Sequence, residues 1–393
     1  MDAATPPHPE LSAQRLGGLL RAEVLEPLKS SFVGKDEIID LLGLCLAARE
    51  NLFLLGPPGT AKSALVQGVA RQIEGRVFDY LLTRFTEPNE IFGPFDIRKL
   101  REGELETNTA GMLPEADFVF LDELLNANSA ILNSLLLVLN ERVFRRGRET
   151  RPLPTLMVVG ASNHLPEDEA LGALFDRFLV RVNCPNVPDE GLEQVLAAGW
   201  RLDQRTEKLN GATHPINADD IRGLHGLIPQ VSLEAIRTPF VELVLRLRGA
   251  GITISDRRAV KLQRLVAASA LLCGRLAANV TDLWVLRYIW DSEDEQEILS
   301  SLVSQALESA TDEARAGGHP RSLVSEAPDP EQLHSDLSQL AAALQAGDEV
   351  ERSRLRDRLT LLTARCQWVP DAQQRTFLEA EATNLWRTLE TQP

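Results

Sequence analysis

Short apolar runs alternate with segments of helical periodicity through the first half of the chain. Continuous apolar runs of this length indicate strands buried on both faces, and the helical segments between them indicate crossover connections. This alternation requires a parallel sheet with helices on both faces, so we predict an α/β domain over residues 31–185. The expected strands are residues 51–55, 77–82, 118–123, 156–163 and 178–182.

The pattern becomes all-helical after a proline-containing linker at residues 184–189. No convincing strand run follows, and apolar positions recur with helical spacing, which predicts a separate all-α domain over residues 190–290. Its expected helices are residues 192–201, 218–227, 233–248, 256–275 and 282–290, and Ser255 is expected to cap the fourth.

The remaining segments are more polar or less regular. Residues 1–30 are predicted to form a tail and an amphipathic helix. Residues 291–393 are lean in large apolar residues and are interrupted by a Gly/Pro/Ser loop at about 317–330, which predicts a small C-terminal helical bundle. Residues 36–48 are apolar nearly all round and predict a buried helix. Residues 96–113 predict an exposed hairpin, either a pore-facing contact or a tolerated surface insertion.

A phosphate-loop pattern follows the first predicted strand. Residues 56–63, with the sequence GPPGTAKS, have the glycine spacing that aims backbone N–H groups at a polyphosphate. The pattern assigns Lys62 to the β- and γ-phosphates and Ser63 to Mg²⁺. Ala61 stands where glycine is usual, and we expect a helical backbone there, which would accommodate its methyl group.

Two carboxylates end the third predicted strand. Asp122 is placed to hold hydrated Mg²⁺, and Glu123 to orient an attacking water. An ordinary strand–turn–helix corner with a chance lysine would explain the first motif alone, but the second motif makes that explanation poor. Together the two motifs predict Mg²⁺-dependent ATP hydrolysis.

Charge and cysteine content exclude several classes. The formal net charge of −16 argues against a footprint for DNA or anionic lipid, although the patches at residues 145–148 and 257–258 are basic. Because the N-terminal residues lack an apolar signal region and no segment has the apolar length of a membrane helix, we expect a cytoplasmic protein without membrane insertion. Four widely separated cysteines are expected to be reduced core thiols: Cys45, Cys184, Cys273 and Cys366.

The order of the motifs resembles an AAA+ ATPase over roughly residues 30–290. The phosphate loop, Asp122–Glu123, the strand-terminal Asn163 and Asp176–Arg177 occur in that order, and a helical domain carrying residues 255–258 (SDRR) follows. Within this superfamily, the hairpin before Asp122, the segment at residues 109–117 and the phosphate loop with Ala61 resemble the MoxR group, closest to its RavA-type members. The β-rich insertion of RavA-type proteins is absent, and only the loop at 317–330 stands in its place.

The resemblance implies roles for further residues. Asn163 matches the first sensor, Arg177 the arginine finger that enters the neighbouring subunit's site, and Arg257 the second sensor. An asparagine as a turn former and a structural Asp176–Arg177 ion pair are the alternatives for the first two. Arg258 is expected to be a surface or intersubunit charge, and His164 a histidine without an acid–base role. The residues expected around ATP or ADP are Val33, Gly34, Gly56, Pro57, Gly59, Thr60, Ala61, Lys62, Ser63 and Leu65.

The function expected from the resemblance is that of a ring-forming remodelling ATPase of the MoxR type. It implies a homo-oligomer, expected to be a hexamer, chaperone-like action on protein complexes and a von Willebrand factor A domain partner. Three alternatives stay open at this point: the ATPase subunit of a metal chelatase, a nucleic-acid motor, and a nucleotide-gated scaffold that does not hydrolyse ATP. The charge of −16 disfavours the nucleic-acid motor, and four intact motif residues disfavour the scaffold.

Overall fold

The structure is a computed structural model of the 393-residue chain. It describes residues 9–391 apart from 103–105, 147–148, 167–168, 207–215, 325–329, 345–354 and several positions between 357 and 370. In the described part, no helix is long and apolar enough to span a lipid bilayer. All four cysteines are free thiols.

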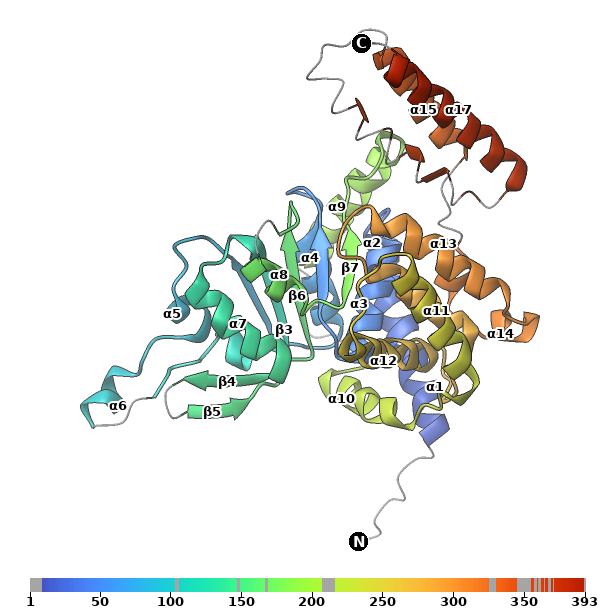
Figure 1. Cartoon of the computed structure of the whole chain (residues 1–393). Helices are drawn as coiled ribbons and strands as arrows, with labels where there is room; N and C mark the ends of the chain where they lie inside the picture. The colour runs from blue at the N-terminus through green and yellow to red at the C-terminus, as the bar shows by residue number, and fades with distance from the viewer. Residues whose placement is uncertain are drawn as a thin grey trace.

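A five-stranded parallel sheet forms the centre of the first domain (Figure 1). The strand order is β2-β3-β6-β1-β7, so the strand that precedes the phosphate loop lies between β6 and β7. Every residue of β1 and β6 is buried, as expected for strands covered on both faces. The five predicted strands are confirmed, with these bounds: β1 Leu52–Leu55, β2 Val77–Leu81, β3 Phe118–Asp122, β6 Met157–Ser162 and β7 Val180–Asn183.

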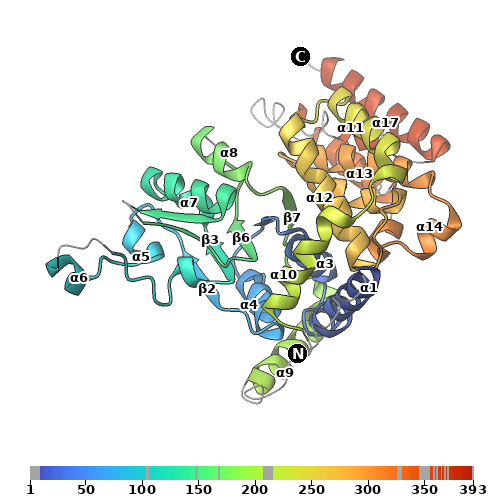
Figure 2. The same cartoon turned by 90° about the horizontal axis from the view of Figure 1, so that it is seen from below.

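Helices cover both faces of the sheet. Helices α7 and α8 lie on one face and α4 on the other, as the view from below shows (Figure 2). Helix α3 packs against β1 and β7, and its residues from Ile38 onward are all buried, which confirms the helix expected there. The helices of this domain are α3 Asp36–Ala48, α4 Lys62–Gln72, α5 Pro88–Phe92, α6 Ile97–Arg101, η2 Leu113–Glu115, η3 Leu124–Asn126, α7 Ser129–Glu141 and α8 Glu169–Phe175.

A projection carrying α6 extends from the sheet domain (Figure 1). Its two sides pair through an antiparallel bridge between Phe95 and Thr107, which confirms the exposed hairpin and adds a short helix to it. The hairpin of β4 (Val143–Arg146) and β5 (Glu149–Pro152) braces the base of the projection. Arg146 Nη1 donates to the Gly93 carbonyl at 2.6 Å, and its guanidinium lies 4.1 Å from the centre of the Phe95 ring. The tip of this basic hairpin lies outside the described residues.

The helices that follow β7 form one core with the helices at the N-terminus. Helix α1 packs against α10 and α12, and Leu20 and Val24 are fully buried in the main core. The elements are α1 Pro9–Leu19, the π-helix η1 Leu20–Leu25, α2 Glu26–Ser31, η4 Asp189–Gly191, α9 Leu192–Thr206, α10 Ala218–Leu227, η5 Ile228–Gln230, η6 Glu234–Ile236, α11 Arg237–Gly249, α12 Asp256–Leu272, η7 Val280–Tyr288, α13 Glu295–Glu308, α14 Asp312–Ala316 and η8 Pro320–Leu323.

Two expectations for these helices meet different outcomes. The Ser255 side chain accepts a hydrogen bond from the Arg258 backbone N–H at 3.2 Å, so the predicted cap of α12 is confirmed. The helix expected at residues 282–290 is instead the 3-10 helix η7, where Trp284 is fully buried. Helix α13 packs against η7 and α11. The domain boundary expected at residue 290 stays a prediction.

The first half of the loop expected at 317–330 is built into the fold. The His319 ring is 1% exposed and stacks on Trp284 with ring centres 4.7 Å apart. Arg287 Nη1 donates to the carbonyls of Arg321 and Val324, at 3.2 and 2.8 Å. Residues 317–324 therefore form an ordered segment, here called the strap, that packs on η7. The ring stacking and the buried hydrogen bonds hold it in place, although its glycines and proline suggested a flexible loop.

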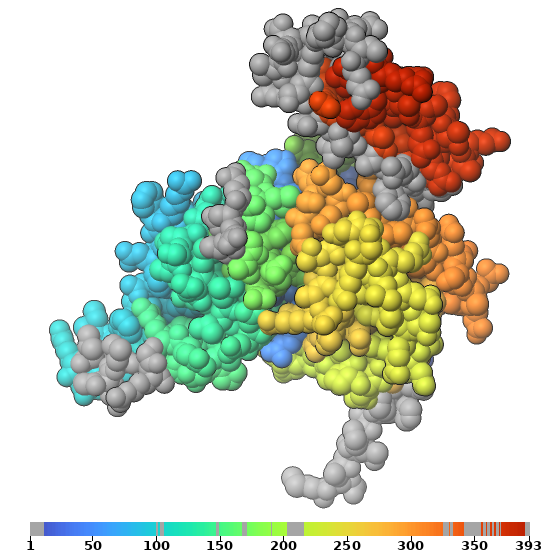
Figure 3. All heavy atoms as spheres, viewed as in Figure 1, coloured from blue at the N-terminus to red at the C-terminus, as the bar shows by residue number. Residues whose placement is uncertain are grey.

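The C-terminal helices α15 (Pro330–Leu344) and α17 (Ala372–Thr391) pack on each other beyond the main body (Figure 3). Their apolar side chains form a cluster separate from the main core, with Leu333, Leu337 and Leu378 nearly inaccessible to solvent. A small apolar cluster of this kind agrees with the lean composition of this part of the chain.

Candidate nucleotide site

The phosphate loop joins the end of β1 to the start of α4. Gly56 donates its N–H to the Ser162 carbonyl at 2.9 Å, so the loop starts as a continuation of the β1–β6 ladder. A Cβ atom at Gly56 would lie 2.3 Å from the Cys184 carbonyl oxygen. Only glycine fits here, because the backbone that follows β7 passes directly against the loop.

The expectation of a helical backbone at Ala61 is wrong. Ala61 has φ 65° and ψ 23°, which is the left-handed region, and the helical hydrogen-bond pattern starts only at Lys62. A Cβ atom in this region costs roughly 1–2 kcal/mol. The loop keeps its turn in spite of the alanine, and it does so at the expense of stability.

Lys62 lies inside the loop that it ends. Its side-chain ammonium donates to the carbonyls of Gly56 and Pro57, at 2.9 and 2.8 Å, and the residue is 7% exposed. Thr60 Oγ1 donates to the Pro57 carbonyl at 3.0 Å and tightens the same turn. The ammonium forms no ion pair with a carboxylate in the described part of the chain, so no side-chain charge there competes with an anion for Lys62.

The two carboxylates stand at the end of β3. Asp122 Oδ1 accepts the Glu123 N–H at 3.0 Å, and Glu123 itself is left-handed with φ 50°. Asn126 Nδ2 donates to Glu123 Oε2 at 3.3 Å and orients that carboxylate. The chain after Glu123 forms the short helix η3 and then α7, because the Asn128 side chain caps α7 by accepting the N–H groups of Ala130 and Ile131.

Strand register brings these motifs to one edge of the sheet. Leu55 pairs with Ser162, and Leu121 pairs with Gly160 on the same strand β6. Because β3, β6 and β1 are adjacent and parallel, the loop after β1, the carboxylates after β3 and Asn163 after β6 share the carboxyl end of the sheet. Asn163 is exposed. The neighbouring His164 lies with Nδ1 3.0 Å from the Leu165 carbonyl oxygen, which accepts a hydrogen bond when Nδ1 carries the proton.

Arg177 follows helix α8, and its backbone is held by a polar chain that the sequence did not reveal. Asn51 Nδ2 donates to the Arg177 carbonyl at 2.9 Å, and Arg142 Nη2 donates to Asn51 Oδ1 at 2.6 Å. Burial lowers the pKa of Arg142 to about 10, and nearby Glu50 partly offsets this effect. Asn51 directly precedes β1. Its position before the strand was therefore the only sequence feature that could have suggested its hydrogen bond to Arg177.

The guanidinium of Arg177 forms no ion pair with the adjacent Asp176. Its Nε is buried and has no hydrogen-bond partner in the described part of the chain, while Asp176 is exposed. The structural ion pair considered as an alternative is therefore absent from these residues. A buried guanidinium nitrogen without an acceptor is costly, and several arginines of the described residues share this state, so the finger role of Arg177 stays a prediction.

The two arginines in the first turn of α12 have different environments. Arg257 is exposed. Arg258, expected to be a surface or intersubunit charge, instead pairs with Asp291 at 2.7 Å and donates to the carbonyls of Ile289 and Thr253. Arg258 is paired because the chain after η7 returns to the start of α12 and supplies the Ile289 carbonyl and the Asp291 carboxylate as acceptors.

Asp291 also binds an arginine from the sheet domain. Arg181 on β7 is 1% exposed at its side chain and reaches Asp291 Oδ1 at 2.7 Å and the Trp290 carbonyl at 2.7 Å. Burial lowers the pKa of Arg181 to about 10, although the Asp291 charge acts in the opposite direction. We call Arg181, Arg258 and Asp291 the Asp291 cluster. The cluster connects the sheet to the first turn of α12, and no sequence motif predicted it.

Gly34, one of the residues expected around ATP or ADP, lies beside the segment after β7. Gly34 has φ 68°, and a Cβ there would lie 3.3 Å from Val187 Cγ2. Lys35 Nζ donates to the Pro185 carbonyl, which holds the two segments together. The Leu65 side chain is fully buried in the core, so any contact of Leu65 with a nucleotide would have to use its backbone.

Comparison with known proteins agrees with this architecture. Residues 19–226 match the family model of the MoxR domain in the MoxR-vWA-beta-propeller ternary systems. The chain belongs to the MoxR family of AAA+ proteins. Residues 238–303 of this MoxR-family protein match an AAA lid domain. The predicted AAA+ fold is confirmed, whereas the RavA-type subgroup stays a prediction.

Similar proteins come from archaea and bacteria. Two uncharacterized proteins of Methanocaldococcus jannaschii are each 35% identical, over 276 residues (70% of this chain, 72% of the relative) and 284 residues (72% and 73%). The chaperone MoxR1 of Mycobacterium tuberculosis is 29% identical over 189 residues, 47% of this chain and 49% of that protein. A crystal structure from Cytophaga hutchinsonii, provisionally described as an ATPase, has a TM-score of 0.61 at 19% identity and covers 77% of this chain and 97% of that one. At this identity the likeness shows the fold alone.

Proposed function

We propose that this MoxR-family protein hydrolyses ATP in a homo-oligomeric ring, as a remodelling ATPase with chaperone-like action on protein complexes. The observation that carries the proposal is the convergence of Lys62, Asp122–Glu123 and Asn163 at the carboxyl end of three adjacent parallel strands. Ligands of open α/β sheets bind at this end. A polyphosphate suits the loop, because Lys62 supplies an ammonium that is held by the Gly56 and Pro57 carbonyls and has no carboxylate partner among the described residues.

Each residue has a defined task in this proposal. Lys62 binds the β- and γ-phosphates, and Glu123, held by Asn126, orients the attacking water. Asn163 donates its amide to that water or to the γ-phosphate. The hydroxyl of Ser63 and the carboxylate of Asp122 would hold Mg²⁺, which when bound neutralises charge on the phosphates. Arg257, exposed in the first turn of α12, would reach the phosphates from the lid.

Arg177 supports the oligomeric part of the proposal. Its guanidinium has no carboxylate partner in the described part of the chain, and its backbone is fixed through Asn51. An arginine held in this way is suited to complete the site of a neighbouring subunit, a contribution worth roughly 10³ to 10⁵ in turnover. The family model that matches this chain is named for systems that include a vWA protein, which supports a von Willebrand factor A domain partner by analogy.

Two variants separate nucleotide binding from hydrolysis. Glu123→Gln should bind ATP with unchanged affinity and lose turnover, whereas Lys62→Ala should lose binding. Affinity purification of the Glu123→Gln protein with ATP should also recover the partner in its bound state. If Glu123→Gln hydrolyses ATP at the wild-type rate, the assigned role of Glu123 is wrong.

Subunit mixing tests the shared site. Arg177→Ala should bind ATP and barely hydrolyse it, and an excess of Lys62→Ala subunits, which still carry Arg177, should restore part of the activity. Asp176→Ala is the matched control and should stay active, because Asp176 forms no ion pair with Arg177. Mixed rings that contain both variants and remain inactive would exclude a finger acting between subunits.

A further inference from the structure

Helix α9 has an exposed apolar stripe in addition to its buried face. Leu192, Leu196 and Trp200 are 54%, 66% and 70% exposed. Their spacing of four residues places them on one side of the helix, over a length of about 12 Å. Ala198 is buried, so another side of α9 already packs on the protein. Three large apolar side chains in one row, one of them tryptophan, are typical of a contact surface.

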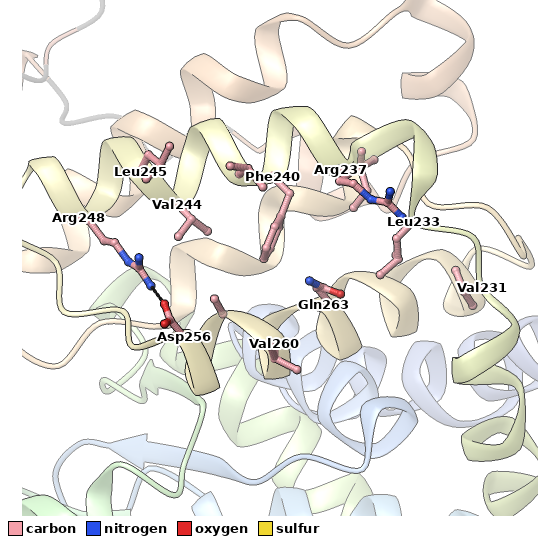
Figure 4. A pocket seen from close by; sticks show the side chains of 13 residues that line it. Val231, Leu233, Arg237, Phe240, Val244, Leu245, Arg248, Asp256, Val260 and Gln263 are labelled. Carbon is pink, nitrogen blue, oxygen red and sulfur yellow. Dashed lines mark hydrogen bonds and ion pairs between the residues drawn. The ribbon is translucent and has the colours of Figure 1, made fainter.

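A groove between α11 and α12 has matching properties. Figure 4 shows its apolar walls and the charged groups at its two ends. The groove has a volume of about 440 Å³, enough for the side chains of one helix face, and Val241, Leu245 and Val260 on its rim are 49%, 58% and 65% exposed. The α11 part of the groove runs from Arg237 to Arg248, about 16 Å. We call this feature the lid groove.

The stripe and the lid groove lie on opposite faces of the molecule. Helix α11 is at the front in Figure 1, whereas α9 is behind the sheet domain, and the view in Figure 2 separates them by the full depth of the body. A chain therefore cannot bring its own α9 into its own groove. Two different complementary patches on opposite faces give a head-to-tail contact between copies, which forms a ring when the rotation closes.

The charges at the two ends set a direction. At one end of the lid groove Arg237 is exposed, and at the other Arg248 pairs with Asp256 at 2.8 Å, whose carboxylate is 97% exposed. Helix α9 carries the exposed Glu193 at the start of its stripe and the exposed Arg201 at the end. A helix α9 that runs parallel to α11 places Glu193 near Arg237 and Arg201 near Asp256. The opposite direction would bring Arg201 to Arg237, a meeting of like charges, and Glu193 to the Arg248–Asp256 ion pair.

We propose that the Leu192–Leu196–Trp200 stripe of α9 packs into the lid groove of a second copy of this chain, with α9 parallel to the neighbour's α11. This inference rests on the homo-oligomer in the proposed function and specifies which surfaces join the subunits. The occupant is a copy of the chain because the length, the apolar character and the charge order of the groove are all matched by α9. Every subunit then provides one stripe and one groove.

A charge exchange tests the direction of the contact. Glu193→Arg and Arg237→Glu should each weaken assembly roughly tenfold, because each places like charges at one end of the groove. The double variant should return to within roughly twofold of the wild type. Leu196→Asp should weaken assembly by at least roughly 30-fold. Leu323→Asp is the matched control, since Leu323 is 63% exposed and lies outside both surfaces. Analytical ultracentrifugation over a concentration series measures each value.

Cross-linking gives an independent reading of the same contact. A chain with Leu196→Cys and Val260→Cys should form disulfide-linked ladders under mild oxidation, while each single variant should form none. Rings of wild-type affinity in Leu196→Asp, failed rescue in the double charge variant, or no ladder would each overturn the proposed contact. In all three cases assembly and ATP hydrolysis of the wild type are measured alongside. If the wild type assembles and hydrolyses ATP, the proposed function holds and only this contact is wrong.

Discussion

Removal of the Asp291 carboxylate should destabilise the protein more than any change of an exposed ion pair. Arg181 cannot lose its proton near neutral pH, and its side chain is 1% exposed. In Asp291→Ala its guanidinium keeps the Trp290, Ile289 and Phe175 carbonyls, at 2.7, 3.3 and 3.2 Å, but loses its ion-pair partner and keeps only the more distant charges of Asp176 and Glu295. Removing one partner of a buried ion pair costs about 3–5 kcal/mol.

Arg181→Met should cost less, about 1–3 kcal/mol. The methionine fills much of the same volume, and Asp291 keeps its ion pair with Arg258 at 2.7 Å. Three carbonyl groups lose a donor, but no charge is left buried without a partner. The two variants of the Asp291 cluster therefore distinguish a missing counter-charge from a missing hydrogen-bond donor.

Urea unfolding of the full chain, followed by circular dichroism and by tryptophan fluorescence to which the buried Trp290 beside Asp291 contributes, measures the free energy of unfolding. Asp219→Ala is the matched control, because Asp219 pairs with Arg222 at 2.7 Å but is 89% exposed, and such pairs contribute about 0–1 kcal/mol. If the free energy of unfolding of Asp291→Ala lies within about 0.5 kcal/mol of the wild type, or if Arg181→Met is the less stable variant, the buried charge of Arg181 does not depend on Asp291.

Three further outcomes are expected. Ala61→Gly should raise the free energy of unfolding by up to about 1 kcal/mol, because glycine tolerates φ 65°; calorimetry checks this, and no gain would contradict it. Burial lowers the pKa of His319 from 6.5 to about 3. Below pH 6.5 the unfolded chain therefore binds one more proton than the folded chain, and the free energy of unfolding falls by about 1.4 kcal/mol for each pH unit that the pH decreases. His319→Gln should flatten that slope, which melting curves at several pH values measure. Deletion of residues 328–393 should leave ATP affinity unchanged, because α15 and α17 have their own apolar cluster; lost affinity in a folded truncation would place them in the nucleotide-binding unit.

The sequence alone determined the sheet and the location of the candidate site. Continuous apolar runs depend only on neighbouring residues, and they identified all five strands of the sheet. The phosphate loop could also be recognised, because its glycine spacing and Lys62 lie within one short segment, although the contact with the Cys184 carbonyl that requires glycine at Gly56 is tertiary. The position of Asp122 at a strand end followed from the same local pattern, and the rule for parallel sheets then predicted that these motifs meet.

Only the tertiary structure decided how the surrounding charges are used. Arg258 looked like a surface charge until the chain after η7 brought Asp291 to it, and Asn51 gained its role from the distant Arg177 carbonyl. The strap at residues 317–324 looked like a free loop until His319 stacked on Trp284. In each case the partner is more than 30 residues away along the chain, and a side chain's burial and hydrogen bonds depend on which distant segments fold against it, a property that local composition does not contain.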